Sequence, residues 1–304
     1  MPSVVRRFAC TSCGRCCNRA PEMELAEATA LAGTFVTSLL FRVHSLPLSE
    51  RSEWAGRWWR DRQSRVPLRP ALDEAERHLR HFASRRIDKT RARQIFLDIS
   101  AIADDEGQEC CPALADNRCT IYQVRPQTCR TVPLHYSRAP STLENYLDQF
   151  TATPDYRCDT SPAAPAILDG NKVLDPQIGE DRAKAVALAK TDRKWKERLL
   201  ALMDDPAQAA AVGLPTYDAA LSNSDNGYAT LLPMIVAWRV AAHEGLLTRE
   251  TLQDLCRKQA ALIRERIARD PAGDALKALL DSLAVYEREL SDGNVRDALP
   301  SRSC

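Results

Sequence analysis

The sequence lacks the glycine motifs of the common nucleotide-binding and serine-hydrolase folds. It contains 11 glycines in 304 residues, and no two of them stand two positions apart, so G-x-G-x-x-G is absent. Neither G-x-x-x-x-G-K-[ST] nor G-x-S-x-G occurs. These absences argue against a Rossmann dinucleotide fold, a P-loop nucleotide site and a nucleophile-elbow hydrolase.

Excess charge of one sign, aromatic residues and long hydrophobic runs are also scarce. Lys and Arg number 42 against 41 Asp and Glu, which gives a net charge of +1, and aromatic residues make up 6%. The most apolar run, residues 229–242, contains Pro233 and Arg239 and is too short to span a bilayer. Residues 1–7 show no apolar signal-peptide core. We therefore expect a cytoplasmic protein with no membrane segment, and the charge balance does not favour nucleic acid as a partner.

Cysteine, by contrast, is abundant and clustered. Of the 11 cysteines, nine lie in the first 158 residues, in two groups. The first block is Cys10, Cys13, Cys16 and Cys17, and the second is Cys110, Cys111, Cys119, Cys129 and Cys158. In a reducing compartment, clustered cysteines are more often metal ligands than disulfides, and their odd total argues against a closed disulfide set.

The spacing of the first block suits a thiolate-ligated metal. A two-residue gap lets two thiolates face one ion across a tight turn, and Gly14 frees the backbone to make that turn. Zinc needs four ligands, and thiolates suit zinc and iron–sulfur clusters alike. The C-x2-C-x2-C run of Cys10, Cys13 and Cys16 also matches the first three positions of a bacterial ferredoxin motif, although no fourth cysteine follows. Both metals therefore stay open, with a slight preference for iron–sulfur.

Two stretches resemble one known family. The first is Phe8-Ala-Cys10-x2-Cys13-Gly14-x-Cys16-Cys17, and the second runs from Cys111-Pro112-Ala-Leu114 through Arg118-Cys119-Thr-Ile121-Tyr122 to Arg125-Pro126-x2-Cys129-Arg130. Together they are similar, over about residues 5–30 and 108–160, to the YkgJ-type cysteine-cluster family, the zinc- or iron-chelating CxxCxxCC domain. The resemblance implies a metal-binding domain with distant similarity to flagellin lysine N-methylases. About ninety residues separate the two blocks here, and Cys110 is an extra thiol.

The ligand set combines the motif with this resemblance, which also implies a late cysteine. We predict metal ligation by Cys10, Cys13, Cys16, Cys17, Cys111, Cys119, Cys129 and Cys158. The side chains of adjacent cysteines point apart, so neither block by itself can supply all the thiolates that one ion needs. We therefore expect the two blocks to converge on one compact centre.

The predicted fold is mainly α, with an irregular cysteine-rich metal-binding domain at residues 1–165 and a helical C-terminal domain at residues 180–292. Inserted helices occupy residues 21–93 of the first domain, at about 21–41, 49–65 and 71–86, and a strand is expected at 94–103. Prolines keep residues 111–158 irregular, with metal cross-links in place of a core. Further helices are predicted at 180–204, 227–244, 248–269 and 271–291.

The leading hypothesis is a cytoplasmic metal-binding protein holding zinc or an iron–sulfur cluster. One alternative is a metal-dependent protein N-methylase like the flagellin enzymes, so whether the chain is an enzyme is left open, as is a protein partner or substrate. Another is a nucleic-acid module at residues 51–93, which hold 13 Arg or Lys against six Asp or Glu with three interleaved tryptophans. Weaker candidate ligands are His78, His81 and His135. Arg125 and Arg130 are expected either to lower thiolate pKa values or to bind backbone carbonyls.

Overall fold

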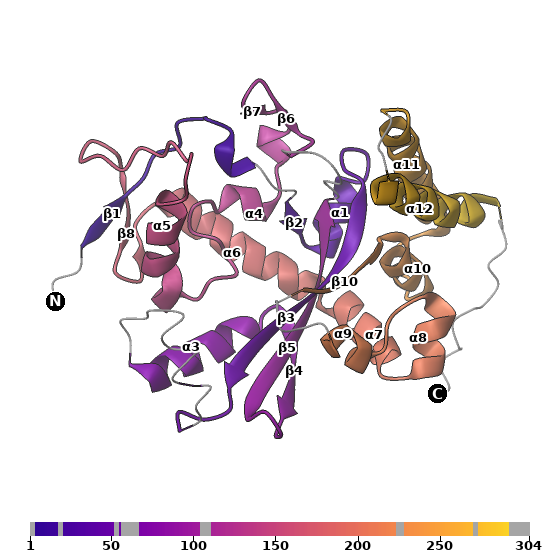
Figure 1. Ribbon diagram of the computed structural model, residues 1–304, viewed down its shortest axis with the longest axis horizontal. Coiled ribbons are helices and arrows are strands. Elements are labelled where there is room, and N and C mark those ends of the chain that lie inside the picture. The colour runs from indigo at the N-terminus through magenta and orange to yellow at the C-terminus, as the bar shows by residue number, and fades with distance from the viewer. Residues whose placement is uncertain are drawn as a thin grey trace. The chain divides into compact units, whose positions relative to one another are not determined.

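A computed structural model describes residues 4–17, 21–51, 55, 67–103, 111–222, 228–269 and 273–291. The chain, which Figure 1 draws from indigo at the N-terminus to yellow at the C-terminus, divides into two compact units that alternate along the sequence. Unit 1 comprises residues 1–21, 44–98 and 113–190, and unit 2 comprises residues 22–43, 99–112 and 191–304. The division into domains at residues 1–165 and 180–292 stays a prediction.

The mainly-α prediction is wrong, because strands form three sheets among the described residues. The largest sheet has the order β10-β3-β5-β2, with β4 also paired to β5. Its strands are β2 (Glu22–Met23), β3 (Thr37–Pro47), β4 (Ala83–Asp88), β5 (Arg93–Ala103) and β10 (Tyr228–Pro233). The other sheets are β1 (Val5–Arg7), β8 (Ala166–Asp169) and β9 (Lys172–Val173), and the hairpin of β6 (Leu114–Ala115) and β7 (Arg118–Cys119). The protein is a mixed α/β fold.

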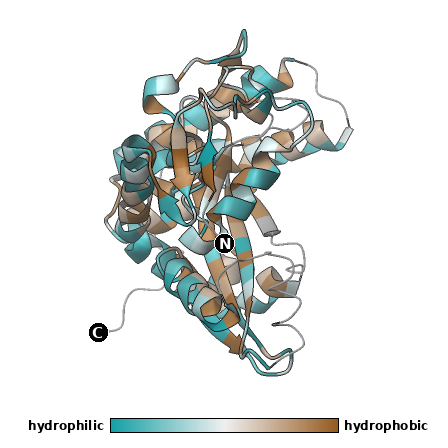
Figure 2. Cartoon of the chain, turned by 90° about the vertical axis from the view of Figure 1, so that its left-hand side faces the viewer, coloured by the Kyte–Doolittle hydropathy of each residue, from teal (hydrophilic) through white to brown (hydrophobic). Residues whose placement is uncertain are grey.

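Besides its small sheets, unit 1 contains helices. They are α3 (Leu68–Leu79), α4 (Gln127–Arg130), α5 (Leu143–Thr151) and α6 (Pro176–Thr191), with 3-10 turns η1 (Arg15–Cys17), η2 (Tyr122–Val124) and η3 (Pro140–Thr142). The amphipathic helix α3 packs Leu72 and Leu79 against Phe96 of β5. In Figure 2 the helices show both hydrophilic and hydrophobic residues, as expected for elements buried on one side.

Unit 2 holds most of the C-terminal helices. They are α1 (Leu25–Ala30), α7 (Arg193–Met203), α8 (Pro206–Val212), α9 (Tyr217–Ser222), α10 (Ile235–His243), α11 (Arg249–Ile267) and α12 (Gly273–Ser291). Thr248 caps α11 by accepting a hydrogen bond from the amide of Thr251 at 3.1 Å. The predicted helices at 248–269 and 271–291 are thus confirmed as α11 and α12, and the one at 180–204 divides into α6 and α7. No helix in the described part of the chain is long and apolar enough to cross a membrane.

Three predicted helices are partly strands. Residues 21–41 give the short α1 and then β3, residues 71–86 give α3 and then β4, and residues 227–244 give β10 and then α10. β3 is mostly buried along its length, so it lacks the alternation that marks a half-exposed strand, and such a run cannot be told from a buried helix by periodicity. β4 is held by six paired positions on β5, from Ala83 opposite Asp98 to Asp88 opposite Arg93. The strand predicted at 94–103 is confirmed as β5.

The stretch around the second cysteine block has an apolar core, contrary to expectation. Its buried members are Phe8, Leu134, Leu143, Leu147, Ile167 and Leu168, and Cys158 packs against them. Residues 122–151 also contain α4 and α5. Prolines shorten the helices here but do not prevent packing. Metal ligation would therefore add to a core that already exists.

Candidate metal centre

The first cysteine block is joined by backbone hydrogen bonds to the segment that ends the second. The amide of Phe8 donates to the carbonyl of Pro165 at 3.0 Å. Ala9 and Asp159 form an antiparallel bridge, exchanging bonds of 2.8 and 3.1 Å. One residue further, Cys10 therefore stands opposite Cys158. The hydroxyl of Thr11 then donates to the carbonyl of Arg157 at 2.6 Å, so the two segments stay adjacent.

The loop that follows directs backbone amides at the thiols. Ser12 has φ of 55° and Gly14 has φ of 72°, and these left-handed residues turn the chain after each of the first two cysteines. The amide of Ser12 donates to Sγ of Cys10 at 3.4 Å. Hydrogen bonds from the backbone of Arg15 and of Arg157 lower the pKa of Cys13. Donors aimed at sulfur stabilise the thiolate, which is the form that binds a metal.

The thiols of Cys16 and Cys158 also lie near this loop. A hydrogen bond from Cys17 lowers the pKa of Cys16 to about 7. Burial raises the pKa of Cys158 to about 11, and the charges of Cys16, Cys13 and Cys10 add to that increase. Like charges oppose ionisation only when they are near one another. The structure therefore brings together Cys10, Cys13, Cys16 and Cys158, which the sequence places up to 148 residues apart (158 − 10).

The hairpin that bears Cys119 lies against the same loop. A Cβ atom at Gly14 would lie 3.0 Å from Oδ1 of Asn117. It would also lie 3.3 Å from Cα of Asn117 and 3.3 Å from Cδ2 of Leu114. Leu114 is paired across the hairpin with Cys119. Glycine thus permits a close approach between the first block and the β6–β7 hairpin. This contact places one further member of the second block near the loop.

For Cys129 and Cys111, the structure gives the surrounding segment rather than a contact with the first-block loop. Cys129 lies in α4, where Arg130 donates from Nε to the carbonyl of Arg125 at 3.0 Å and from its guanidinium to the carbonyl of Gln123. Arg125 stacks on the ring of Tyr122 at 3.6 Å. Of the two roles predicted for Arg130, the structure thus shows carbonyl binding. Cys111 belongs to unit 2, whereas the other seven predicted ligands belong to unit 1.

The donor chemistry of the cluster fits a thiophilic metal. Cys10 is exposed and the other seven predicted ligands are half-buried, so the thiols are accessible from solvent. Sulfur donors suit zinc and iron and suit magnesium or calcium poorly. Among the described residues, no three Cys, His, Asp or Glu side chains already surround one point closely enough to hold an ion. Binding would therefore require side-chain rotations within the loop.

The three candidate histidines have protein partners of their own. The Nε2 atom of His78 lies 2.9 Å from the carbonyl oxygen of Tyr136, and the ring of His81 is 6.2 Å from that of His78. His135 stacks on Tyr136 at 4.7 Å, and its Nδ1 lies 2.8 Å from the hydroxyl of Ser137. Sequence reasoning missed Arg182, which donates to the carbonyl oxygens of Leu134, His135 and Arg138 and so holds the segment that follows α4. Nothing in the local sequence indicates this role.

The basic stretch at residues 51–93 is described only in part, and the three tryptophans lie outside the described residues. In the described part, several arginines pair with acids. Arg69 bonds Asp73 at 2.9 Å, and Arg93 bonds Asp88 at 3.2 Å. Glu76 likewise accepts from Arg80 at 2.5 Å. Local pairing offsets part of the positive charge that the sequence count emphasised.

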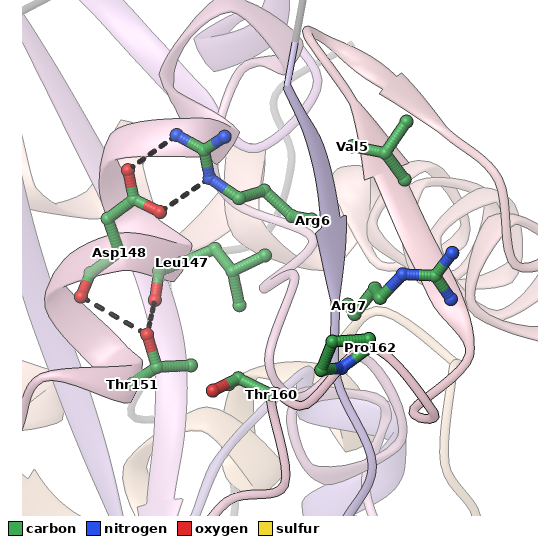
Figure 3. A pocket seen from close by; sticks show the side chains of 8 residues that line it. All are labelled: Val5, Arg6, Arg7, Leu147, Asp148, Thr151, Thr160 and Pro162. Carbon is green, nitrogen blue, oxygen red and sulfur yellow. Dashed lines mark hydrogen bonds and ion pairs between the residues drawn. The ribbon is translucent and has the colours of Figure 1, made fainter.

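A surface pocket of about 380 Å³ lies beside β1 and α5 (Figure 3). It is lined by Val5, Arg6, Arg7, Leu147, Asp148, Thr151, Thr160 and Pro162. Figure 3 shows Arg6 reaching Asp148, with bonds of 2.7 and 2.9 Å, while Arg7 points to the other side. None of the described cysteines lines this pocket. It therefore offers no substrate cavity at the thiol cluster.

Comparison with known proteins identifies one family. Residues 67–159 match the family model CxxCxxCC, described as a "putative zinc- or iron-chelating domain". The match includes Cys111, Cys119, Cys129 and Cys158, and it begins after the first block, so residues 10–17 lie outside it. It also includes residues 67–93, which we had assigned to an insertion. No curated protein and no solved structure matches the chain. The match at residues 67–159 agrees with the family that the cysteine motifs resemble.

Proposed function

We propose that this protein binds zinc or iron through its cysteine cluster. Cys10, Cys13, Cys16 and Cys158 are the primary ligands in this proposal, and Cys17, Cys119, Cys129 and Cys111 are the further donors that the sequence predicts. Four thiolates would satisfy tetrahedral zinc or one iron–sulfur cluster. Clustered thiols stay reduced in a reducing compartment, so the proposal includes a cytoplasmic location.

The observation that supports this most is the position of Cys158. The bridge between Ala9 and Asp159 sets Cys158 opposite Cys10, and burial, followed by the charges of Cys16, Cys13 and Cys10, raises the pKa of its thiol. Ionising all four thiols would place like charges close together, and a divalent cation would relieve that repulsion. The bound metal would supply a positive charge and a cross-link between the two blocks. The protein supplies the amide donors that orient the sulfurs.

Metal content of the full-length chain tests the proposal. We would purify it under anaerobic conditions, measure zinc and iron per chain, and record the absorption spectrum, since an iron–sulfur cluster absorbs visible light and zinc does not. The proposal predicts a stoichiometric amount of one of these metals. A chain that is folded by circular dichroism, contains neither metal, and takes up neither on reconstitution would refute it.

A pair of cysteine variants tests the ligand assignment. Cys158→Ala keeps an apolar side chain against its hydrophobic neighbours but removes the sulfur, so metal content should fall while the fold persists. The control is Cys256→Ala, because Cys256 is buried in α11 of unit 2 and is not a predicted ligand. Equal metal content in both variants would exclude Cys158 as a ligand.

A further inference from the structure

The pairing of residues 9 and 159 has a consequence for thiol chemistry. Ala9 and Asp159 exchange both of their backbone hydrogen bonds, so Cys10 and Cys158 form the next, non-hydrogen-bonded pair. In such a pair the Cα atoms are about 4.5 Å apart and the side chains lie on the same face. A disulfide requires Cα atoms about 4.4–6.8 Å apart. An antiparallel pair of this kind therefore lies within the spacing that a disulfide requires.

Antiparallel pairing places the side chains of Cys10 and Cys158 on one face of the two segments. Cys158 packs against the apolar cluster that contains Phe8. Cys10 is exposed, so its thiol is open to solvent beside the half-buried Cys158. After burial, the charges of Cys16 and Cys13 raise the pKa of Cys158 more than that of Cys10 does, so these two are the competing partners for Cys158. They follow Ser12, however, where a left-handed φ of 55° ends the extended pairing.

We propose that Cys10 and Cys158 are a thiol-oxidation site, and that an oxidised low-molecular-weight disulfide converts them into a cross-strand disulfide in the metal-free chain. Cys10 is exposed and Cys158 is half-buried, so the external disulfide meets Cys10 first. The Cys10 thiolate attacks one sulfur of the reagent, forms a mixed disulfide and releases one small thiol. Cys158 then attacks Cys10, forms the intramolecular S–S bond and releases the second small thiol. Two protein S–H groups are oxidised, and one reagent disulfide is reduced to two thiols.

This reaction also removes two of the proposed metal ligands. A metal bound to both sulfurs would block the attack, and the disulfide would in turn prevent metal binding. The disulfide itself requires no metal, whereas protection by a metal rests on the proposed function. The two ideas can therefore fail separately.

Peptide mapping of the full-length chain tests the proposal. We would treat metal-free, reduced protein with oxidised glutathione, alkylate the remaining thiols and digest with trypsin. Cleavage after Arg7, Arg15, Arg157 and Lys172 separates residues 8–15, which contain Cys10 and Cys13, from residues 158–172, which contain Cys158. Cys16 and Cys17 fall in a third peptide, residues 16–19. The expected product joins residues 8–15 to 158–172 with the loss of two hydrogens.

Cysteine variants identify the two residues that form the disulfide, and zinc loading tests the effect of a bound metal. Cys10→Ser should abolish the cross-link, whereas Cys13→Ser and the buried control Cys256→Ser should retain it. A peptide 158–172 that stays unlinked, or that is linked to residues 16–19, would overturn the proposal. Zinc loaded before oxidation should suppress the cross-link. If the cross-link forms equally with zinc present, the oxidation site stands and the proposed metal function fails.

Discussion

Gly14→Ala is the substitution that best isolates the contact between the cysteine loop and the β6–β7 hairpin. Gly14 has φ of 72°, and an alanine held in the left-handed region costs about 1–2 kcal/mol. Its Cβ would also lie 3.3 Å from Cα of Asn117, a backbone atom that cannot rotate away. Small overlaps of this kind in a packed site cost about 1 kcal/mol or more. The expected total is therefore about 2–3 kcal/mol.

Zinc affinity of the variant would be measured by competition with a chromophoric chelator. If the bound state requires this loop conformation, the whole penalty appears in binding, and Kd rises about 30- to 140-fold at 1.4 kcal/mol per tenfold change. Urea denaturation of the metal-free chain measures any part of the penalty that is expressed without metal. The loss of zinc-binding free energy and the loss of unfolding free energy should together equal the estimated penalty.

Gly213→Ala is the matched control. Gly213 has φ of 78° at the end of α8, and a Cβ added there would meet nothing within 4 Å. Its alanine variant should therefore lose about 1–2 kcal/mol of unfolding free energy from the backbone alone, with zinc affinity unchanged. If Gly14→Ala binds zinc as tightly as this control, the loop–hairpin contact plays no part in metal binding, and our reasoning about it is wrong.

Two other predictions concern stability. Gln259→Leu should lower the free energy of unfolding by about 2–5 kcal/mol in urea denaturation, because the buried amide of Gln259 bonds three backbone groups that would lose their partner. As a control, Gln149→Leu at an exposed position should change the free energy of unfolding by less than about 0.5 kcal/mol. Equal losses in the two variants would contradict this prediction. Burial lowers the pKa of His78 to about 4, so the unfolded chain binds the extra proton and stability should fall as pH drops from about 6.5 toward 4. His78→Gln should flatten this acid limb and the exposed His243→Gln should not; an unchanged limb in His78→Gln would show that another group governs it.

The sequence by itself predicted the family model that matches residues 67–159 and proposed the cysteine ligands of the centre. Cysteine spacing is a local property, and a C-x2-C turn with a glycine works in any fold that exposes it, so the motif at residues 10–17 and the block around Cys119 and Cys129 could be found without coordinates. The cap at Thr248 and the helices α11 and α12 were predictable for the same reason, because a cap residue and a 3.6-residue period are encoded within the segment itself.

Only the tertiary structure decided which long apolar runs became strands and which cysteines meet. Residues 37–47 became β3 because neighbouring strands satisfy their backbone groups on both edges, and burial of both faces erased the alternation that would have revealed a strand. Cys158 reached Cys10 because one antiparallel bridge, Ala9 with Asp159, joins segments 150 residues apart (159 − 9). Such a pairing depends on the packing of Phe8 into a distant apolar cluster, and no spacing within either block contains that information.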